Sequence, residues 1–507
     1  MVSQTVALAS TVATLAVFTV AGLWYARGRV GTVEDLLTAR NSTGTAAMTA
    51  TLIASTMGAW ILFSPAEAGA AFGGITAVLG YAIGSAIPLL FFIPVGARIR
   101  ELMPRGHSLT EFVLVRFGPA MYLVVLVVSV FYMFIFLAAE MTAIAGSLEL
   151  VAGVPAWQTA TAVGLFVLVY TAYGGLVASI FTDTVQTLVI LPLLGVGFGA
   201  AVLSLGGTDA IYTTAMSTDP TLLDPGFGPG LEFGLYVVFA VLGANMLNQG
   251  IWQRVYAADG ASTLSRSFGV AALTVVPMVL LAGLFGVAAS GLGLVTPETQ
   301  SVAFFLVVSE VLPETVTLAV VLLVVLLVMS SADTMLNAIS SLVTVDLARL
   351  GAIDGQQSLR LVGRGVTVAV AFGAIGIGAQ GYSVLQLFLT ADLLAAAVFV
   401  PLIWGLYAEA LSERGALVGC VAGLVVGIAY SPMLRGLLLV VPGVDGLLPE
   451  PAFLPAFLGA TGVSTLVTGL AVAVGSADFE FEALSTELRS FDEPAAADPQ
   501  AAGEVSD

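Results

Sequence analysis

The residues best placed to do chemistry lie in one long apolar segment, residues 321–350, which runs VLLVVLLVMSSADTMLNAISSLVTVDLARL. Ser330, Ser331, Asp333 and Thr334 follow a run of hydrocarbon side chains with no turn signal before them. Hydroxyl and carboxylate oxygens at membrane depth can replace the water around a small cation. A serine inside a helix can instead bond back to a carbonyl one turn earlier, so both interpretations stay open on these residues alone.

Four more ionisable side chains lie inside apolar segments: Glu67, Glu140, Asp183 and Asp392. A charge at membrane depth is costly, so such a residue usually faces a cavity or a partner. A buried carboxylate can also be protonated or bonded to the backbone, and for Glu140 and Asp392 this structural role weighs as much as a functional one. Asp183 and Asp333 are the candidates for carrying a proton.

Two apolar segments contain residues that interrupt a helix. In STMGAWILFSPAEAG (55–69) these are Gly58 and a proline, and in VLGANMLNQGIWQR (241–254) they are glycines and amides that include Asn248 and Gln249. Backbone that leaves the helix at membrane depth persists only where it lines a cavity or is buried in protein. Matched interruptions in two halves of a chain indicate the binding site of a transporter.

The composition excludes a water-surrounded globule. The chain has 507 residues, 58% of them hydrophobic and 9% charged, whereas a soluble domain carries about a quarter charged residues. Its one cysteine, Cys420, excludes an intrachain disulfide, and its one histidine excludes a histidine metal cluster. The 33 acidic residues stand against 15 basic ones, all arginine. This balance is typical of proteins from salt-accumulating halophiles and offers no basic patch for nucleic acid.

Apolar runs long enough to cross a bilayer recur along the chain, so we expect an all-α integral membrane protein with about thirteen transmembrane helices. The predicted spans are 5–26, 46–73, 77–98, 118–149, 156–174, 178–205, 231–257, 262–290, 315–347, 361–379, 384–408, 415–433 and 452–475. The expected organisation is an extra N-terminal transmembrane helix with a cytoplasmic loop (1–45), a transport core (46–410), two C-terminal transmembrane helices (411–475) and a disordered acidic cytoplasmic tail (476–507).

The two interrupted segments are the second and the seventh predicted spans. The second to sixth spans and the seventh to eleventh can therefore form two repeats, and because five is odd the repeats would cross the membrane in opposite senses. The same offset places Asp183 and Asp392 on matched helices. We expect a 5+5 inverted-repeat core of ten helices, two of them discontinuous.

Arginine placement predicts the orientation in the membrane. With the loop 27–45 in the cytoplasm, every arginine except Arg435 falls on the cytoplasmic side, Arg254 among them. Cytoplasmic loops of membrane proteins carry an excess of basic residues. We therefore expect a multi-pass plasma-membrane protein with its N-terminus outside, its C-terminus in the cytoplasm, and the acidic loops 206–230 and 291–314 outside.

Three motifs resemble those of the sodium:solute symporter family, and the resemblance covers roughly residues 34–430. They are YTAYGGLVA (170–178) with TDTVQ (182–186), NQGIWQRVYAADG (248–260) and SSADTMLNAISSLVTVDLAR (330–349). A later segment, GALVGCVAGLVVG (415–427), is similar to the family's glycine pattern only in part. The resemblance implies a ten-helix inverted-repeat core with flanking helices, in agreement with the repeat inferred from the helix breaks.

The resemblance also implies a sodium site where the first broken helix meets the hydroxyl-bearing segment. Its ligands would be the backbone carbonyls of Ala54, Met57 and Leu327 and the side chains of Ser330 and Ser331. Carbonyls freed at a helix break can replace the hydration oxygens of sodium. Asp183 matches an aspartate that the family places near the sodium exit toward the cytoplasm.

The solute site is expected between the two breaks, at Trp60, Asn248 and Gln249. An indole offers a flat apolar wall and amides offer donors and acceptors, which suits a small polar solute, although Trp60 can equally be a core- or lipid-facing aromatic. Ile61 and Ile251 stand where sugar-carrying members of the family have a glutamine and a tyrosine. A urea- or amino-acid-like solute is therefore favoured over a sugar. With no arginine expected at this depth, a solute carboxylate would be held by the N-terminus of a half-helix.

We predict a symporter and not an enzyme, in which sodium running down its gradient carries a small organic solute inward by alternating access. The co-transported sodium ion is the cofactor expected. The expected partners are the solute and membrane lipid, with no nucleic acid and no obligatory protein partner. A transporter-like membrane sensor, a proton-coupled carrier and a channel are the alternatives, and the sequence leaves open the identity of the solute, the stoichiometry, the oligomeric state and the roles of Asp333 and Asp392.

Overall fold

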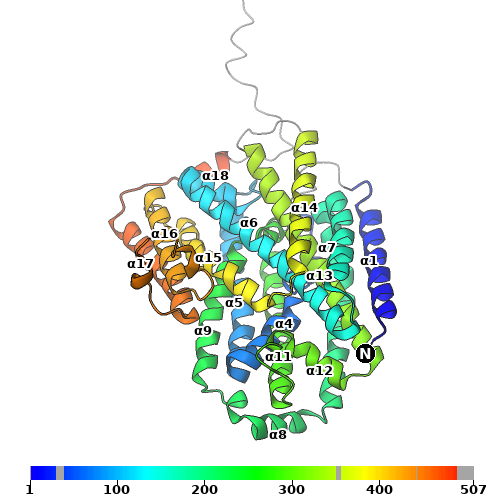
Figure 1. The fold of residues 1–507 in the computed structure, drawn as a ribbon. Coiled ribbons are helices and arrows are strands. Elements are labelled where there is room, and N and C mark those ends of the chain that lie inside the picture. Colours follow the sequence, from blue (N-terminus) through cyan, green and yellow to red (C-terminus); the bar gives the residue numbers. More distant parts are fainter. Residues whose placement is uncertain (1, 30–38, 350–355, 441, 488–507) are drawn as a thin grey trace, which may run out of the picture.

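The fold is built from helices and their connecting loops, as the composition predicts. The computed structural model describes residues 2–29, 39–349, 356–440 and 442–487. Within these ranges there is no β-strand, and the only β-pairing is an isolated bridge between Thr43 and Ala258. The expected all-α membrane architecture is confirmed (Figure 1).

The helices differ widely in length, and the long apolar ones form the bundle. In chain order they are α1 Gln4–Ala26, α3 Thr45–Thr56, α4 Trp60–Glu67, α5 Gly74–Leu102, α6 Leu109–Ala152, α7 Ala156–Ser204, α8 Thr208–Thr218, α9 Gly228–Met246, α10 Gln249–Ala257, α11 Ala261–Gly291, α12 Ala303–Val311, α13 Glu314–Arg349, α14 Gln356–Gly378, α15 Val384–Gly405, α16 Glu413–Tyr430, α17 Phe453–Val474 and α18 Glu482–Glu487. A π-helical turn, Ala68–Gly73, follows α4.

Eleven helices among the described residues are long and apolar enough to cross a membrane, so the expected count of thirteen is not confirmed. The difference lies in two segments that are each counted once, Trp60–Leu102 with 43 residues and Ala156–Ser204 with 49. A straight helix of that length would measure about 65 Å or more, roughly twice the bilayer core. Each segment instead turns at glycines with positive φ, which favours residues without a Cβ. These glycines are Gly73 (142°) and Gly74 (59°) in the first segment and Gly175 (53°) in the second.

Two helices are broken within their apolar segments, as expected. The first consists of α3 and α4 and the second of α9 and α10. Five long elements follow from each break: α3–α4, α5, α6 and the two parts of α7, and then α9–α10, α11, α13, α14 and α15, with the short helix α12 between α11 and α13. This order confirms the 5+5 core. Helix α13 packs against both α6 and α7, which places its hydroxyls deep in the bundle.

Helices outside the core cover its two edges. Helix α1 packs on α7 at one edge, and α16 and α17 pack on each other and on α15 at the other (Figure 1). The start of the acidic tail is ordered, which corrects the expectation of a wholly disordered tail. Phe479 and Phe481 lie against the guanidinium groups of Arg116 and Arg98, at 4.3 and 5.1 Å from the ring centres, and Leu484 of α18 is buried. Residues 488–507 lie outside the described ranges.

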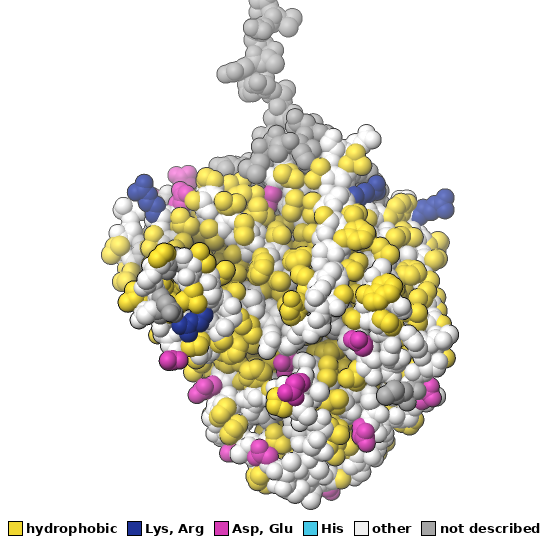
Figure 2. Space-filling view, viewed as in Figure 1, with side chains coloured by type: hydrophobic (Ala, Val, Ile, Leu, Met, Phe, Trp, Pro, Cys, Tyr) yellow, Lys and Arg dark blue, Asp and Glu magenta, His cyan; other side chains and the backbone are white. Residues whose placement is uncertain are grey.

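The surface carries an apolar band between two charged ends. Figure 2 shows hydrophobic side chains over the middle of the molecule, with most of the exposed basic side chains toward the end that bears α18 and most of the acidic ones toward the end that bears α8. An apolar band flanked by polar ends is the surface that a bilayer requires. The charge distribution has the sense that the arginine pattern predicts, and the orientation itself stays a prediction.

Candidate functional site

The first helix break frees backbone groups in the middle of the bundle. Helix α3 ends at Thr56 and α4 begins at Trp60, and Met57 leaves the helix with φ −98° and ψ 83°. Among the described residues, no backbone N–H is bonded to the carbonyls of Ala54 and Met57. Both residues are fully buried. Two of the three carbonyls expected around sodium are therefore free to bind a cation.

Glu140 of α6 lies directly against this break. Its carboxylate accepts hydrogen bonds from the backbone N–H groups of Ala59 (2.7 Å) and Trp60 (3.3 Å), and from the hydroxyl of Ser331 (2.7 Å). The N-terminus of α4 carries a partial positive charge, which favours a carboxylate there. A Cβ on Gly58 would lie 2.1 Å from the carboxylate oxygen, so only glycine lets Glu140 approach. The sequence identifies Glu140 as a buried ionisable residue but does not place it at the ion site.

Both serines of α13 are fully buried and face the break, not lipid. Ser331 donates to Glu140, and its hydroxyl also lies 3.0 Å from the carbonyl of Leu327. Ser330 donates to Asp183 of α7, and Asp183 in turn accepts from Thr51 of α3 at 2.6 Å. Two carboxylates, Asp183 and Glu140, thus connect the predicted serines of α13 to the first broken helix.

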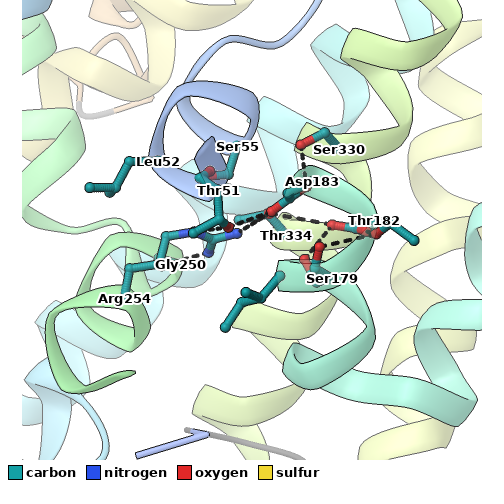
Figure 3. Close-up of polar contacts among 12 residues, drawn as sticks. Thr51, Leu52, Ser55, Ser179, Thr182, Asp183, Gly250, Arg254, Ser330 and Thr334 are labelled. Carbon is teal, nitrogen blue, oxygen red and sulfur yellow. Dashed lines mark hydrogen bonds and ion pairs between the residues drawn. The ribbon is translucent and has the colours of Figure 1, made fainter. Parts of the chain in front are cut away.

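Asp183 is paired with a buried arginine (Figure 3). Arg254 of α10 lies 3.0 Å from the Asp183 carboxylate and also donates to Thr51 (3.1 Å) and Thr334 (2.9 Å). Its side chain bonds back to the carbonyl of Gly250 and is fully buried. The placement of Arg254 in a cytoplasmic loop was therefore wrong, and a cation does lie within the bundle, where it joins α3, α7, α10 and α13.

Asp333 faces α7. It accepts hydrogen bonds from Tyr170 (2.7 Å) and Ser179 (2.8 Å). The adjacent Thr334 accepts a hydrogen bond from the guanidinium of Arg254. Thr334 also donates to Asp333 at 3.3 Å, so it joins this carboxylate to the guanidinium that pairs with Asp183. The network therefore connects α7 to α13 through both carboxylates.

A cavity of about 50 Å³, partly open to solvent, lies beside the two breaks. Trp60 and Asn248 line it, as predicted for the solute site, and so does Asp392 of α15. Gln249 does not line it. Its amide nitrogen donates to the carbonyl of His107 at 2.7 Å and its oxygen accepts from Leu109, so this side chain fastens α10 to the start of α6.

The sequence resembles membrane transporters over most of its length. The profile of the sodium:solute symporter family matches residues 36–423. A spermidine transporter of Candida albicans is 27% identical over 375 residues, which cover 74% of this chain and 70% of that one. A sodium/glucose cotransporter of Vibrio parahaemolyticus is 26% identical over 501 residues, or 88% of each chain.

A urea–proton symporter of Oryza sativa is also similar, with 24% identity over 70% of this chain and 54% of its own length. Among solved structures, the substrate-bound outward-open state of a Na⁺-coupled sialic acid symporter superposes with a TM-score of 0.74, covering 93% of this chain and 98% of that chain at 16% identity. At that identity the likeness shows the fold.

Proposed function

Because the chain belongs to the sodium:solute symporter family, we propose that the break between α3 and α4 and the serines of α13 form its sodium site. The chain is a multi-pass membrane transporter that couples a small solute to sodium. Residues 46–410 would form the transport core, with 1–45 and 411–475 flanking it in the plasma membrane.

The proposal is supported by one observation: two buried carboxylates link the serines of α13 to the first broken helix. Ser330 donates to Asp183, which accepts from Thr51, and Ser331 donates to Glu140, which accepts from the backbone of Ala59. The carbonyls of Ala54 and Met57 at this break have no N–H partner among the described residues. A dehydrated sodium ion needs such a set of oxygens. The carbonyl of Leu327, next to Ser331, would complete it.

Asp183 would serve the ion on its way out toward the cytoplasm. It is the carboxylate that holds Ser330, and its partner Arg254 comes from the second broken helix. A cation that leaves the serines therefore meets a carboxylate whose charge is already shared with an arginine. Sodium can leave such a site readily, because the arginine weakens the pull of the carboxylate on it.

The solute would occupy the cavity beside Trp60 and Asn248, midway between the two breaks. A urea- or amino-acid-like solute is favoured over a sugar, because Ile61 and Ile251 offer no polar group where the family's sugar carriers do. The similar transporters include carriers of urea, spermidine and glucose. The class of solute is therefore inferred from the residues of this chain.

The test is uptake into proteoliposomes that contain the purified chain, under an imposed sodium gradient and, separately, an imposed proton gradient. The panel is urea, proline, acetate, glucose and a nucleobase. We expect sodium, and not the proton gradient, to accelerate uptake of one nitrogen-containing solute. Uptake driven by protons alone would favour the proton-coupled carrier, for which Asp183 and Asp333 are the candidate proton carriers.

A further inference from the structure

The cavity beside the two breaks has an aromatic wall. Five of its residues are aromatic: Trp60, Tyr81, Tyr132, Phe136 and Phe388. Their rings form a continuous row in which each ring contacts the next. The centroid separations are 5.8 Å for Tyr81–Trp60, 6.4 Å for Trp60–Phe388, 5.0 Å for Phe388–Phe136 and 6.2 Å for Phe136–Tyr132. Ring faces attract cations through their negative quadrupole.

One ionisable carboxylate, Asp392, lies in this wall. It is four residues after Phe388 on α15 and so lies on the same helix face. Asp392 is only 5% exposed, yet its Oδ1 atom has no hydrogen-bond partner. Among the described residues that line the cavity there is no arginine. A buried carboxylate with no cation beside it is costly unless a ligand supplies the positive charge.

Several other polar groups of the cavity can accept hydrogen bonds from a ligand. The hydroxyl protons of Thr56 and Ser85 are donated to backbone carbonyls, to Leu52 and Tyr81 respectively, which leaves their lone pairs. Asn245 donates one amide N–H to Val241, which leaves its second N–H and its carbonyl oxygen. The cavity therefore offers acceptors to the N–H groups of a ligand as well as amide donors.

The two half-helix N-termini beside the cavity, which could bind an anionic solute, are both occupied. The N-terminus of α4 is already occupied by Glu140, and that of α10 is capped by the side chain of Asn248, which accepts from Gly250 at 2.9 Å. Neither half-helix N-terminus is then free to hold a solute carboxylate, which removes the recognition expected from sequence. The charge of the cavity is set by Asp392.

We propose that Asp392 and the aromatic wall bind a small organic cation, a protonated amine or guanidinium group, as the transported solute. This inference rests on the proposed function but changes the solute favoured there, because it selects positively charged solutes over neutral urea as well as over sugars and anions. Asp392 pairs with the charge, and the rings of Trp60 and Phe388 enclose the apolar part.

Guanidinium and urea make the sharpest pair of probes, since they share size and planar shape and differ in charge. Binding of radiolabelled guanidinium is measured on the full chain in detergent at saturating sodium, with methylammonium, tetramethylammonium, urea and acetate as competitors. We expect the cations to compete and urea to bind at least about 30-fold more weakly. Asp392→Asn, which is isosteric, removes this preference, and Asp392→Glu retains it.

The matched control is Glu67→Gln. Glu67 is also a buried carboxylate, but it accepts from Ser383 at 2.9 Å and does not line the cavity. This substitution removes the same charge and leaves the cation preference unchanged. Urea binding as tightly as guanidinium, no binding of any of the three cations, or a preference that survives Asp392→Asn would each overturn the inference.

Uptake separates this inference from the proposed function. If the cations bind through Asp392 but a sodium gradient does not accelerate their entry into proteoliposomes, the cation site stands and sodium coupling fails. If sodium drives urea uptake that Asp392→Asn leaves unchanged, the transporter assignment stands and the cation site is wrong.

Discussion

A serine hydroxyl has one proton to donate and two lone pairs that can accept, and the contacts of Ser331 indicate where its proton goes. The nearest acceptor is the Glu140 carboxylate at 2.7 Å, closer than the carbonyls of Leu327 (3.0 Å) and Val328 (3.3 Å). A proton donated to Glu140 leaves the lone pairs for a cation. From the sequence, Ser331 could either bond back to a carbonyl of its own helix or bind sodium. The contact with Glu140 leaves the hydroxyl able to bind a cation, and the contact with the Leu327 carbonyl can persist beside it.

Replacing Ser330 and Ser331 together by alanine tests this role. Each serine is a hydroxyl partner of a buried carboxylate, and losing a hydrogen bond to a charged group costs about 1.5–3 kcal/mol. We expect the sodium concentration for half-maximal uptake to rise by about tenfold or more. Ser340→Ala is the control, because Ser340 is on the same helix and donates to Gly363 away from the break. Unchanged sodium dependence in the double variant would contradict the site.

The serines could be proposed from sequence because their motif is local, whereas their contacts with Glu140 and Asp183 could not be predicted because these residues are distant in the chain. Glu140 is 191 residues from Ser331 and Asp183 is 147 from Ser330. Only the packing of α6 and α7 against α13 joins them. Arg254 was misplaced for a related reason, since a basic residue at the end of a polar segment is typical of a loop. Its side chain folds back into the bundle instead.

At the scale of elements, the break between α3 and α4 is held open by a carboxylate that occupies the space of a side chain. Gly58→Ala would put a methyl group 2.1–2.6 Å from the atoms of the Glu140 carboxylate. Overpacking of this kind costs about 1–3 kcal/mol. We expect weaker sodium binding, measured as a shift of the sodium titration of uptake. Gly146→Ala on α6, where a Cβ meets nothing within 4 Å, should leave the titration unchanged.

The ion pair of Asp183 and Arg254 joins elements from both repeats. Removing one partner leaves an uncompensated buried charge, which typically costs about 3–5 kcal/mol. Arg254→Gln alone should therefore lower the unfolding temperature in detergent more than the double change Asp183→Asn with Arg254→Gln. A double-mutant cycle on the unfolding transition measures the coupling. Additive effects would show that the two side chains do not act as a pair.

The breaks were predictable because glycine, proline and amides clustered inside an apolar run disfavour a continuous helix there. The residues that line the solute cavity were not predictable in the same way. Gln249 has the chemistry of a ligand, but both ends of its amide are bonded to the segment at His107 and Leu109. Asp392 was a candidate in the sequence, but its place in the solute cavity became evident only once five aromatic side chains from four helices lined the same cavity.

At the scale of the whole molecule, apolar length and polar interruptions predicted the bundle, its repeats and the division of two long segments near residues 73 and 174. The conformation of these turns, with positive φ at Gly73, Gly74 and Gly175, is not reported by hydropathy. The start of the tail was missed, because its acidic composition is typical of disorder while its two phenylalanines contact arginines of the bundle. Composition averages over such single contacts.

Orientation is the whole-molecule property that the arginines predict, and the chain is well suited to test it. Its single cysteine, Cys420, is fully buried, so an introduced cysteine would react with little background. Ser217 on α8 and Ser485 on α18 are both exposed and lie toward opposite ends of the bundle (Figure 1). Because basic loops stay in the cytoplasm, the end that bears α18 should face inward. In intact cells a membrane-impermeant maleimide should label Ser217→Cys and spare Ser485→Cys, and permeabilised cells should allow both to react. Labelling of Ser485→Cys alone in intact cells would reverse the orientation, and with it the direction in which Asp183 releases sodium.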